Sequence, residues 1–463
     1  MIEMSGADAF FLREESRARH MHTLKIVVVE PEGADEPPSI ERVRAGAIGV
    51  LPREPAFRRR PLDVPAGFGN PFWVDAQELD PDYHVRHEVL PAGSTDAALD
   101  ELAGRIASEP LDRERPLWQI IFVEGLPNGR VAYVMKIHHA VADGVASAEL
   151  ALRILQENRE PMLYEPWRPQ PAEPLPSRRD RIWAATKTHA RRQRELPGLL
   201  WRSMREVGTS LAWIRSGRTM PAQMFNAPAA RFNQPITPNR VYAHVRLSLP
   251  EIFEVKRSAD CTVNDVFLAL VGGTLHHYLA THGESSGSAF TAAIPVSVRG
   301  NLEDPAFGNA VTAMLATTAS HVADPLERLR VVAESTRAAR TLFERRDARL
   351  AVEWYDHWVL RRLWLHVLPV FLNALLGRPC VNLIASNVRG PSVPLYSNGA
   401  RVSELFSMGP LSGQQGLNFT AWSYLDAFSV GVHACSEHVP DVRLLCDGLA
   451  VELAKLSKQV LRS

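Results

Sequence analysis

The chain has 463 residues, of which 46% are hydrophobic and 22% charged, and its 52 basic residues balance 52 acidic ones. This composition predicts a globular protein with two or three domains, and a net charge of zero gives no reason to expect a nucleic-acid partner. Four cysteines without CxxC or zinc-like spacing favour a reducing, cytoplasmic compartment, and the charges in every stretch of about 18 residues argue against a transmembrane helix.

The first predicted block covers residues 1–158. Acidic residues near its start and the lack of an apolar core there argue against a secretory signal. Periodicity and turn residues predict a strand over 23–29, a helix over 98–107, and a hairpin with strands 119–124 and 131–139 joined by Pro-Asn-Gly at 127–129. The hairpin is expected to bring Trp118 close to the end of its second strand.

That second strand ends in the sequence HHAVADG, which covers residues 138–144. Side chains alternate along a strand, so His139 is expected to share a face with Met135 and Ile137. His138 then points to the opposite face, and the two histidines cannot perform the same task. A helix is predicted after the motif from apolar residues at helical spacing, which are Val145, Ala148, Leu152 and Leu155.

A histidine of near-neutral pKa beside an acid is the usual general base for a hydroxyl or thiol. One histidine suffices for that role, and the other is expected to pack or to form structural hydrogen bonds. Asp143 is expected to cap the following helix or to pair with an arginine, and Gly144 to permit a tight turn. A metal site and a plain core histidine are the alternatives. Neither HExxH nor a Cys/His cluster accompanies the pair, and phosphate-loop and GxSxG motifs are absent from the sequence.

Residues 159–239 read as a linker that is first proline-rich and then basic and helical. Between positions 178 and 218 there are eleven basic residues and three acidic ones. An apolar stripe at helical spacing predicts a solvated helix packed on the domains, with a helix lying on a membrane surface as the alternative. The stripe consists of Leu200, Met204, Val207, Leu211 and Ile214.

The second block covers residues 240–463. Thr262 and Asp265 form a predicted capping box that opens a helix, and a strand over 290–298 follows with Arg299 on its polar face. A further strand is expected around 381–388. Helices and strands interleave in both blocks, which predicts two α/β sandwich-like domains. The helix stripe consists of Phe267, Leu270, Val271, Thr274 and Tyr278.

The run 358–376 is apolar except for two arginines, a histidine and an asparagine. A buried helix of the second block is the first interpretation. A surface that docks on membranes or lipid droplets is the alternative.

HHAVADG resembles the HHxxxDG signature of coenzyme A-dependent acyltransferases and peptide-synthetase condensation domains. More closely, the whole chain resembles the bacterial wax ester synthase/diacylglycerol acyltransferase family. Arg389 stands where proline is usual in the last of the matching segments. Those segments are 115–118 (PLW), 262–266 (NDV), 295–299 (PVSVR), 308–309 (GN) and 386–391 (SNVPGP), together with 8–12 and 21–22 near the N-terminus.

This resemblance implies an α/β (α+β sandwich) fold of two coenzyme A-dependent acyltransferase-like, or chloramphenicol acetyltransferase-like, domains. They are joined by a helical linker, and the active site lies in a channel between them. His139 would then be the base that deprotonates an acceptor hydroxyl, with His138 as a supporting residue and Asp143 paired with an arginine. Arg299 is our candidate for that arginine, because it ends a strand on a polar face. Asn264 is the candidate donor to the oxyanion. The expected binding or supporting residues are Gly144, Asn264, Arg299, Trp118, Ser386 and Asn387.

The resemblance also implies the reaction. It is transfer of an acyl group from acyl-coenzyme A, a cosubstrate, to diacylglycerol or a long-chain alcohol, giving triacylglycerol or wax ester. No metal or bound cofactor is expected, and the implied location is cytoplasmic, peripheral at the inner membrane or on lipid droplets. The alternatives are a condensation-type acyltransferase acting on an amine or glycolipid, and a lipid-binding or droplet-coating protein without catalysis.

Overall fold

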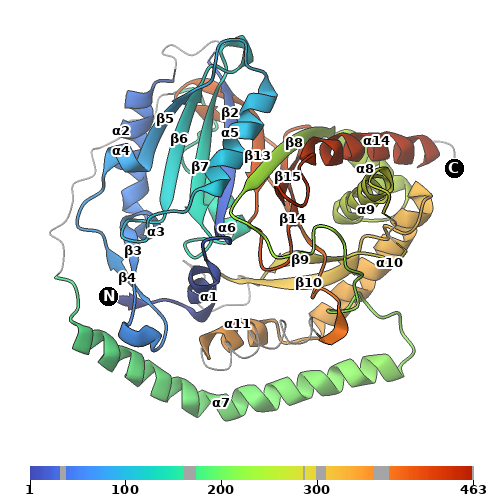
Figure 1. The fold of residues 1–463 in the computed structure, drawn as a ribbon, viewed down its shortest axis with the longest axis horizontal. Helices are drawn as coiled ribbons and strands as arrows, with labels where there is room; N and C mark the ends of the chain where they lie inside the picture. Colours follow the sequence, from blue (N-terminus) through green and yellow to red (C-terminus); the bar gives the residue numbers. More distant parts are fainter. Residues whose placement is uncertain (32–37, 161–173, 285–286, 299–308, 358–374, 461–463) are drawn as a thin grey trace.

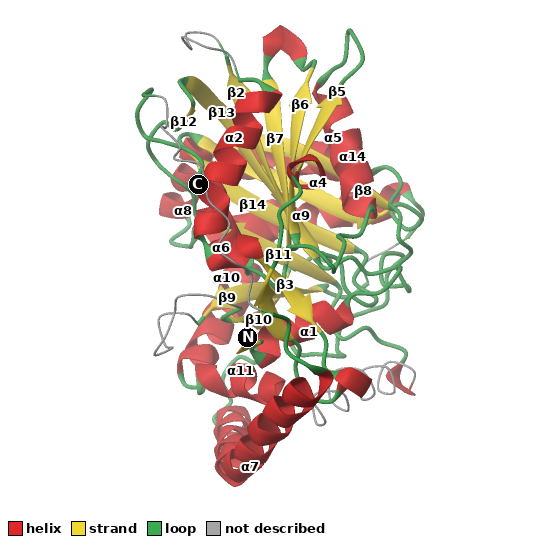
Figure 2. Cartoon of the chain, turned by 90° about the vertical axis from the view of Figure 1, so that its left-hand side faces the viewer, coloured by secondary structure: helices red, strands yellow, loops and turns green. Residues whose placement is uncertain are grey.

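The computed structural model describes residues 1–463 except 32–37, 161–173, 285–286, 299–308, 358–374 and 461–463. Within the described residues, the strands form two six-stranded sheets and one three-stranded sheet (Figures 1 and 2). Helices pack against both large sheets, so the predicted α/β class is confirmed. No helix of the described chain is both long and apolar enough to cross a membrane.

The first large sheet carries the histidine motif. The three strands predicted in the first block are its central members, and their valine, isoleucine and aromatic residues are buried on both faces. In sheet order the strands are β12 (Tyr396–Ser397), β13 (Ala400–Met408), β2 (His22–Glu30), β7 (Val131–His138), β6 (Trp118–Glu124) and β5 (Val85–Val89).

The second large sheet is built from the second block, and it includes the strands predicted near 290–298 and 381–388. In sheet order its members are β10 (Val311–Thr317), β9 (Thr291–Ser297), β11 (Leu383–Val388), β14 (Leu417–Tyr424), β15 (Ala427–Cys435) and β8 (Arg240–Ser248). The small sheet consists of β1 (Ile2–Glu3), β4 (Phe72–Asp75) and β3 (Arg59–Leu62).

Sheet membership does not follow chain order. β13 comes from the second block, yet it pairs antiparallel with β2 of the first, from Met408 opposite Leu24 to Arg401 opposite Glu30. The first sheet is therefore completed by a strand nearly 400 residues later in the chain. The division at 1–158, 159–239 and 240–463 stays a prediction, and β13 crosses it.

The helices cover the outer faces of the sheets and part of the space between them. α5 packs between the first sheet and β8, where Ser108 Oγ accepts a hydrogen bond from Arg240 N at 2.9 Å. The helices are α1 (Gly6–Glu14), α2 (Ile40–Val50), α3 (Pro55–Arg58), α4 (Pro81–His84), α5 (Asp96–Ser108), α6 (Gly144–Leu152), α7 (Arg178–Arg215), α8 (Leu249–Ser258), α9 (Val263–Thr281), α10 (Pro325–Glu344), α11 (Ala348–Asp356) and α14 (Val442–Val460), with 3-10 turns η1 (Leu51–Arg53), η2 (Pro65–Gly67) and η3 (Pro127–Gly129).

The predicted capping box at the start of α9 is confirmed. Thr262 Oγ1 accepts from Asp265 N at 3.2 Å, and Asp265 Oδ2 accepts from Thr262 N at 2.8 Å. The predicted apolar stripe is buried, but so is almost the whole surface of α9 from Asp265 to Leu275. α9 is a core helix because β-sheet, α10 and α14 enclose it.

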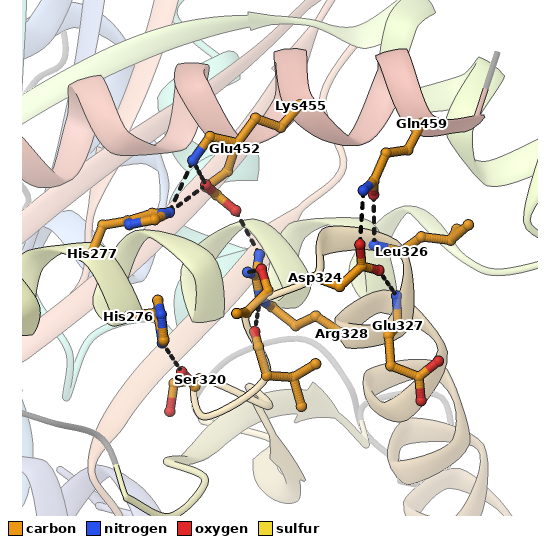
Figure 3. Close-up of polar contacts among 12 residues, drawn as sticks. His276, His277, Ser320, Asp324, Leu326, Glu327, Arg328, Glu452, Lys455 and Gln459 are labelled. Carbon is orange, nitrogen blue, oxygen red and sulfur yellow. Dashed lines mark hydrogen bonds and ion pairs between the residues drawn. The ribbon is translucent and has the colours of Figure 1, made fainter. Parts of the chain in front are cut away.

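A polar network ties α9, α10 and α14 together (Figure 3). Arg328 on α10 and Glu452 on α14 form a buried ion pair at 2.5 Å, and Arg328 also donates to the carbonyls of Val322 and Ala323. His277 of α9 lies 3.1 Å from the same glutamate. A buried pair is tolerated only when its remaining donors and acceptors are bonded, and here they are.

Two local predictions need correction around the motif. β7 ends at His138, so His139 already lies in the turn. α6 ends at Leu152, and its buried residues are Ser147, Ala148, Leu150 and Ala151. Of the predicted stripe, Ala148 and Leu155 are buried, but Leu155 lies beyond the helix and Leu152 is only partly buried. Val145 is exposed because it lies on a different face of α6 from the buried residues.

The basic segment forms α7, a 38-residue helix that runs along the outside of the molecule (Figures 1 and 2). Arg192 holds it to the protein by ion pairs with Glu3 and with Asp356 of α11. Arg202 pairs with Asp347, the N-cap of α11, and with Glu353 of that helix. The predicted apolar stripe faces away from these contacts: all five of its residues are exposed, Met204 to 73%. The helix thus packs on the domains through a different face.

The apolar run 358–376 falls almost entirely outside the described residues. Its last two members, Leu375 and Leu376, are exposed.

Candidate active site

The histidine motif lies where β7 passes into α6. Asp143 is the N-cap of α6, and its Oδ1 accepts from Ala146 N at 2.9 Å. The turn that contains His139 is held to the neighbouring strand, because His139 N donates to Met21 O at 2.6 Å. The motif is therefore fixed by the sheet on one side and by the helix start on the other.

The ring of His139 is oriented by Asn309. His139 Nδ1 lies 2.9 Å from Asn309 Oδ1. The amide nitrogen of Asn309 donates to two oxygens, Asp8 Oδ1 at 2.8 Å and His139 O at 2.7 Å, so the amide cannot be reversed without placing oxygen against oxygen. Since an amide oxygen only accepts, Nδ1 of His139 must carry the proton. Nε2 is then the basic nitrogen.

Asp8 holds Asn309 in turn. It is buried on α1, and its Oδ1 accepts from both the backbone and side-chain nitrogens of Asn309, at 2.7 and 2.8 Å. Burial raises the pKa of Asp8, and the hydrogen bonds from Asn309 oppose that change. A chain of contacts thus runs from α1 through Asn309 to His139, although 170 residues separate the last two.

The environment of His139 favours the neutral ring. Phe11 stacks on it with ring centroids 4.0 Å apart at 25°. Burial lowers the pKa of His139 to about 4, a change that Asp143 and the hydrogen bond with Asn309 oppose and that His138 and Lys25 reinforce. A neutral imidazole with a free Nε2 is the form that can accept a proton.

His138 is buried in different surroundings, as the alternation predicts. Its Nδ1 accepts from Ala140 N at 3.0 Å, and its Nε2 lies 3.5 Å from Glu15 Oε1. Burial alone would raise the pKa of Glu15, but hydrogen bonds and charge from His138 and Arg113 lower it. His138 is thus a structural link between the motif and the residues after α1.

Asp143 has a second contact across the molecule, since its Oδ2 accepts from Ala310 N at 3.2 Å. Its predicted partner, Arg299, lies outside the described residues. The tight-turn role predicted for Gly144 is wrong, because its φ is not in the left-handed range and a Cβ there would have no protein atom within 4 Å. Gly144 instead lines open space beside His139.

That open space is a cavity of about 960 Å³ between the two large sheets and the α7–α11 side of the molecule. His139, Phe11 and Gly144 line it together with two contrasting walls. One wall is apolar and includes Met220, Met224, Leu342, Phe343 and Val381. The other is polar and includes Thr23, Lys25, Ser386, Ser407, Asn418 and Thr420.

The structure places the remaining predicted residues as follows. Ser386 lines the cavity, whereas Asn387, its neighbour on β11, is exposed on the other side of the strand. Trp118 is fully buried and structural: its Nε1 donates to Phe57 O at 2.7 Å, and its ring stacks on His84. Asn264 lies on the first turn of α9, outside the residues that line the cavity.

Sequence reasoning gave no role to Lys25, and it recorded Asp8, Phe11 and Asn309 only as parts of segments that carry a resemblance. Lys25 carried a usable signal, since it is the one charged residue between positions 23 and 29 of an otherwise apolar strand. Asn309 carried none, because its contact with His139 depends on tertiary structure.

Comparison with known protein families gives two matches. A model described as the wax ester synthase/diacylglycerol acyltransferase catalytic domain matches residues 4–267, and one described as the C-terminal domain of the same group matches residues 307–457.

Two relatives come from Mycobacterium tuberculosis, and both are named as candidate diacylglycerol O-acyltransferases. One is 32% identical over 464 residues, covering 99% of this chain and 96% of the relative. The other is 30% identical over 461 residues, covering 98% of this chain and 90% of the relative.

Among solved structures, a wax ester synthase/diacylglycerol acyltransferase from Marinobacter aquaeolei matches with a TM-score of 0.73 at 25% identity, covering 99% of this chain and 100% of that one. The first condensation domain of the calcium-dependent antibiotic synthetase matches with a TM-score of 0.56 at 15% identity, covering 98% of this chain and 96% of that one. The second likeness shows a shared fold alone.

Proposed function

The chain belongs to the wax ester synthase/diacylglycerol acyltransferase family and is an acyltransferase, and we propose that it esterifies diacylglycerol or a long-chain alcohol at His139. Its donor is an acyl-coenzyme A, the cosubstrate of this family. The observation that carries the proposal is the state of His139. Burial lowers the pKa of His139 to about 4 and so favours the neutral ring at neutral pH, its Nδ1 is bound to Asn309, and the side chain lines a large cavity with apolar and polar residues.

The proposed reaction needs no covalent enzyme intermediate. His139 Nε2 takes the proton of the acceptor hydroxyl while the oxygen attacks the thioester carbonyl, forming the new C–O bond. The tetrahedral intermediate then collapses, the C–S bond breaks, and the thiolate of coenzyme A takes the proton back from His139. The products are the ester and free coenzyme A, and the histidine returns to its neutral state.

Asn309 and Asp8 support this step because they hold and stabilise the ring of His139 when it takes up the proton. When Nε2 gains a proton the ring becomes cationic, and the Nδ1–H bond to Asn309 Oδ1 strengthens because its donor is now charged. The buried carboxylate of Asp8, behind the amide, favours that charge. We also propose that Asp143 pairs with Arg299, which lies outside the described residues. An oxyanion role for Asn264 stays a proposal too, since Asn264 is not among the residues that line the cavity.

Replacing the base tests the function. His139→Ala should lower kcat/KM with both acceptors by roughly 10²- to 10⁴-fold, the range for a lost general base. The measurement is release of coenzyme A and ester formation from labelled acyl-coenzyme A.

The same substitution at His87, a partly exposed histidine on β5 paired with Glu124, is the matched control and should leave the rates near those of the parent. Full activity of His139→Ala would refute the mechanism. Parent protein that binds lipid but forms no product would favour the lipid-binding alternative, and product from an amine or glycolipid acceptor alone would favour a condensation-type reaction.

We further propose that the enzyme works at an anionic lipid surface and docks there through α7. The exposed stripe of α7 is accompanied by Trp183 and Trp201, exposed to 73% and 65%. Basic residues flank it, and exposed ones include Arg178, Arg179, Lys187, Arg191, Arg194 and Arg205. Aromatic and aliphatic side chains framed by arginines suit an interface between water and anionic headgroups. Ile214 belongs both to the stripe and to the cavity lining, which would connect the lipid surface to the site.

A further inference from the structure

Lys25 is a buried lysine in the wall of the cavity. It lies on β2, only 1% exposed, and Lys25 Nζ donates to Ser407 Oγ at 2.7 Å. Its amine also lies 5.6 Å from the ring centroid of Trp422. Within the described part of the chain no ion pair with a carboxylate is formed, and burial lowers the pKa of Lys25 to about 7 although the charge of Asp143 opposes that change. Arg346, another basic residue of the cavity lining, is exposed and donates to Ser210.

Three of the other polar groups of this wall donate within the protein. Thr23 Oγ1 donates to Met408 O at 2.6 Å, and Thr420 Oγ1 donates to Asn418 Oδ1 at 2.8 Å. The amide nitrogen of Asn418 donates to Pro410 O at 3.0 Å. The amine of Lys25 has three N–H donors when charged and two when neutral, and one of them is used by Ser407. Lys25 therefore offers at least one N–H donor to a ligand, beside the hydroxyl groups of Ser386 and Ser407.

Lys25 lies on the strand next to the one that leads into His139, the proposed base. β2 and β7 pair Lys25 with Met135 and Thr23 with Ile137, so these residues share the face on which His139 follows. His139 N donates to Met21 O, so His139 lies opposite Met21, and Lys25 is four residues, or about 13 Å, farther along the strand. The long side chain of Lys25 spans part of that separation, and its charge acts to lower the pKa of His139. A group bound at Lys25 would therefore belong to the same acceptor molecule as a hydroxyl at His139.

An apolar acceptor would leave such a group unpaired. A long-chain alcohol has no oxygen besides its reacting hydroxyl, and enclosing a buried ammonium with its alkyl chain would cost binding energy. A diacylglycerol carries two ester carbonyls within a few bonds of its hydroxyl, and a β-hydroxy acid carries a carboxylate there. Either would accept hydrogen bonds from Lys25.

We propose that Lys25 is a specificity residue that binds an oxygen acceptor next to the reacting hydroxyl, so that the preferred acceptor is a glycerol ester or hydroxy acid and not a simple fatty alcohol. This inference rests on the proposed function and narrows it. The apolar wall would hold the acyl chain, and the polar wall the oxygen-bearing part of the acceptor.

The test compares three acceptors with one acyl-coenzyme A: dioleoylglycerol, a long-chain β-hydroxy acid and hexadecanol. The parent should favour one or both oxygen-rich acceptors, and the preferred one identifies whether carbonyl or carboxylate is bound. Lys25→Met, which keeps the length of the side chain, should lower the ratio of kcat/KM for that acceptor to kcat/KM for hexadecanol by about 10- to 100-fold. A ratio within one preparation does not depend on how much of the variant folds.

Lys136→Met is the matched control. Lys136 is also a buried lysine, on the adjacent strand β7, but its ammonium donates to the backbone carbonyls of Ile106 and Glu109 and lies outside the cavity lining. Its loss should leave the acceptor ratio unchanged. If Lys25→Met cannot be purified, the parent alone decides, because faster reaction with hexadecanol than with both other acceptors overturns the inference.

Other outcomes are equally decisive. An unchanged acceptor ratio in Lys25→Met, including a uniform rise in KM for acyl-coenzyme A, would overturn the inference and assign Lys25 to the donor or to the fold. Absence of transfer from the parent to any acceptor would instead refute the proposed function.

Discussion

Asn309 determines which nitrogen of His139 carries the proton. Because its amide nitrogen is committed to Asp8 and to the His139 carbonyl, only its oxygen is available to the ring. Without that acceptor the imidazole is free to place its proton on either nitrogen and to rotate against Phe11. The base would then spend part of its time in a tautomer that cannot accept a proton from substrate.

Asn309→Ala should therefore lower kcat by about 10- to 100-fold, the value of a hydrogen bond to a group that is charged in the transition state. KM for acyl-coenzyme A should change little, since Asn309 acts on the ring and not on the substrate. Steady-state kinetics over both substrates provide the measurement. Asn233→Ala is a suitable control, as Asn233 is also buried and bonds the carbonyls of Asn382 and Gln414. A purely structural role for Asn309 would lower stability in both variants and kcat in neither.

The pH dependence of the reaction should reflect the burial of His139. The base works when neutral, and it is neutral above its pKa, which burial lowers to about 4. kcat/KM should therefore stay level down to about pH 5 and fall below that, whereas an unperturbed histidine would give a midpoint near 6.5. Incubation at pH 4.5 followed by assay at pH 7 separates protonation from acid unfolding. An acidic limb centred near 6.5 would contradict a buried, neutral base.

At the level of elements, close packing around α9 requires glycine. A Cβ built on Gly273 would lie 2.1 Å from both Arg328 Nη1 and Glu452 Oε2, the two atoms of the buried ion pair. Both side chains are fully buried and bonded elsewhere, so neither can move away without losing contacts (Figure 3).

Gly273→Ala should destabilise the protein by about 1–3 kcal/mol and lower its Tm by a few degrees, although alanine is the better helix former. Activity per folded molecule should be retained, since the network lies away from the cavity. Calorimetry or thermal circular dichroism gives the measurement. Gly208→Ala on exposed α7 has no atom within 4 Å of the new Cβ and should be neutral or stabilising. Equal Tm values for the two variants would argue against strain at Gly273.

Local elements were predictable from sequence because their signals are local. The Thr262 capping box, the β2 run of β-branched residues and the Asn128 turn each depend on neighbours within a few positions. The α6 stripe was wrong in part, at Val145, because periodicity does not tell which face meets the core. The α7 stripe was misread for the same reason, since its apolar residues face outward.

At the scale of the whole molecule, contacts between distant segments could not be predicted in this way. β13 joins the first sheet beside β2, and Asn309 reaches His139, without any periodic signal in the chain. The motif itself was found, because its residues are adjacent in sequence. The groups that orient its base come from α1 and from the second block, so only the folded chain assembles the site.

The outer position of α7 leads to a last prediction about the whole enzyme. Binding to vesicles with about 30% anionic lipid should exceed binding to neutral vesicles, and it should weaken as salt screens the basic residues, each worth about 1 kcal/mol near such a surface. Replacing both Trp201 and Met204 by serine should weaken binding at least 10-fold, because their apolar surface no longer enters the interface. Co-sedimentation measures the binding, with Leu444→Ser at an exposed position of α14 as the control. Unchanged binding of the double variant would show that another surface docks, and equal binding to neutral and anionic vesicles would remove the electrostatic part of the proposal.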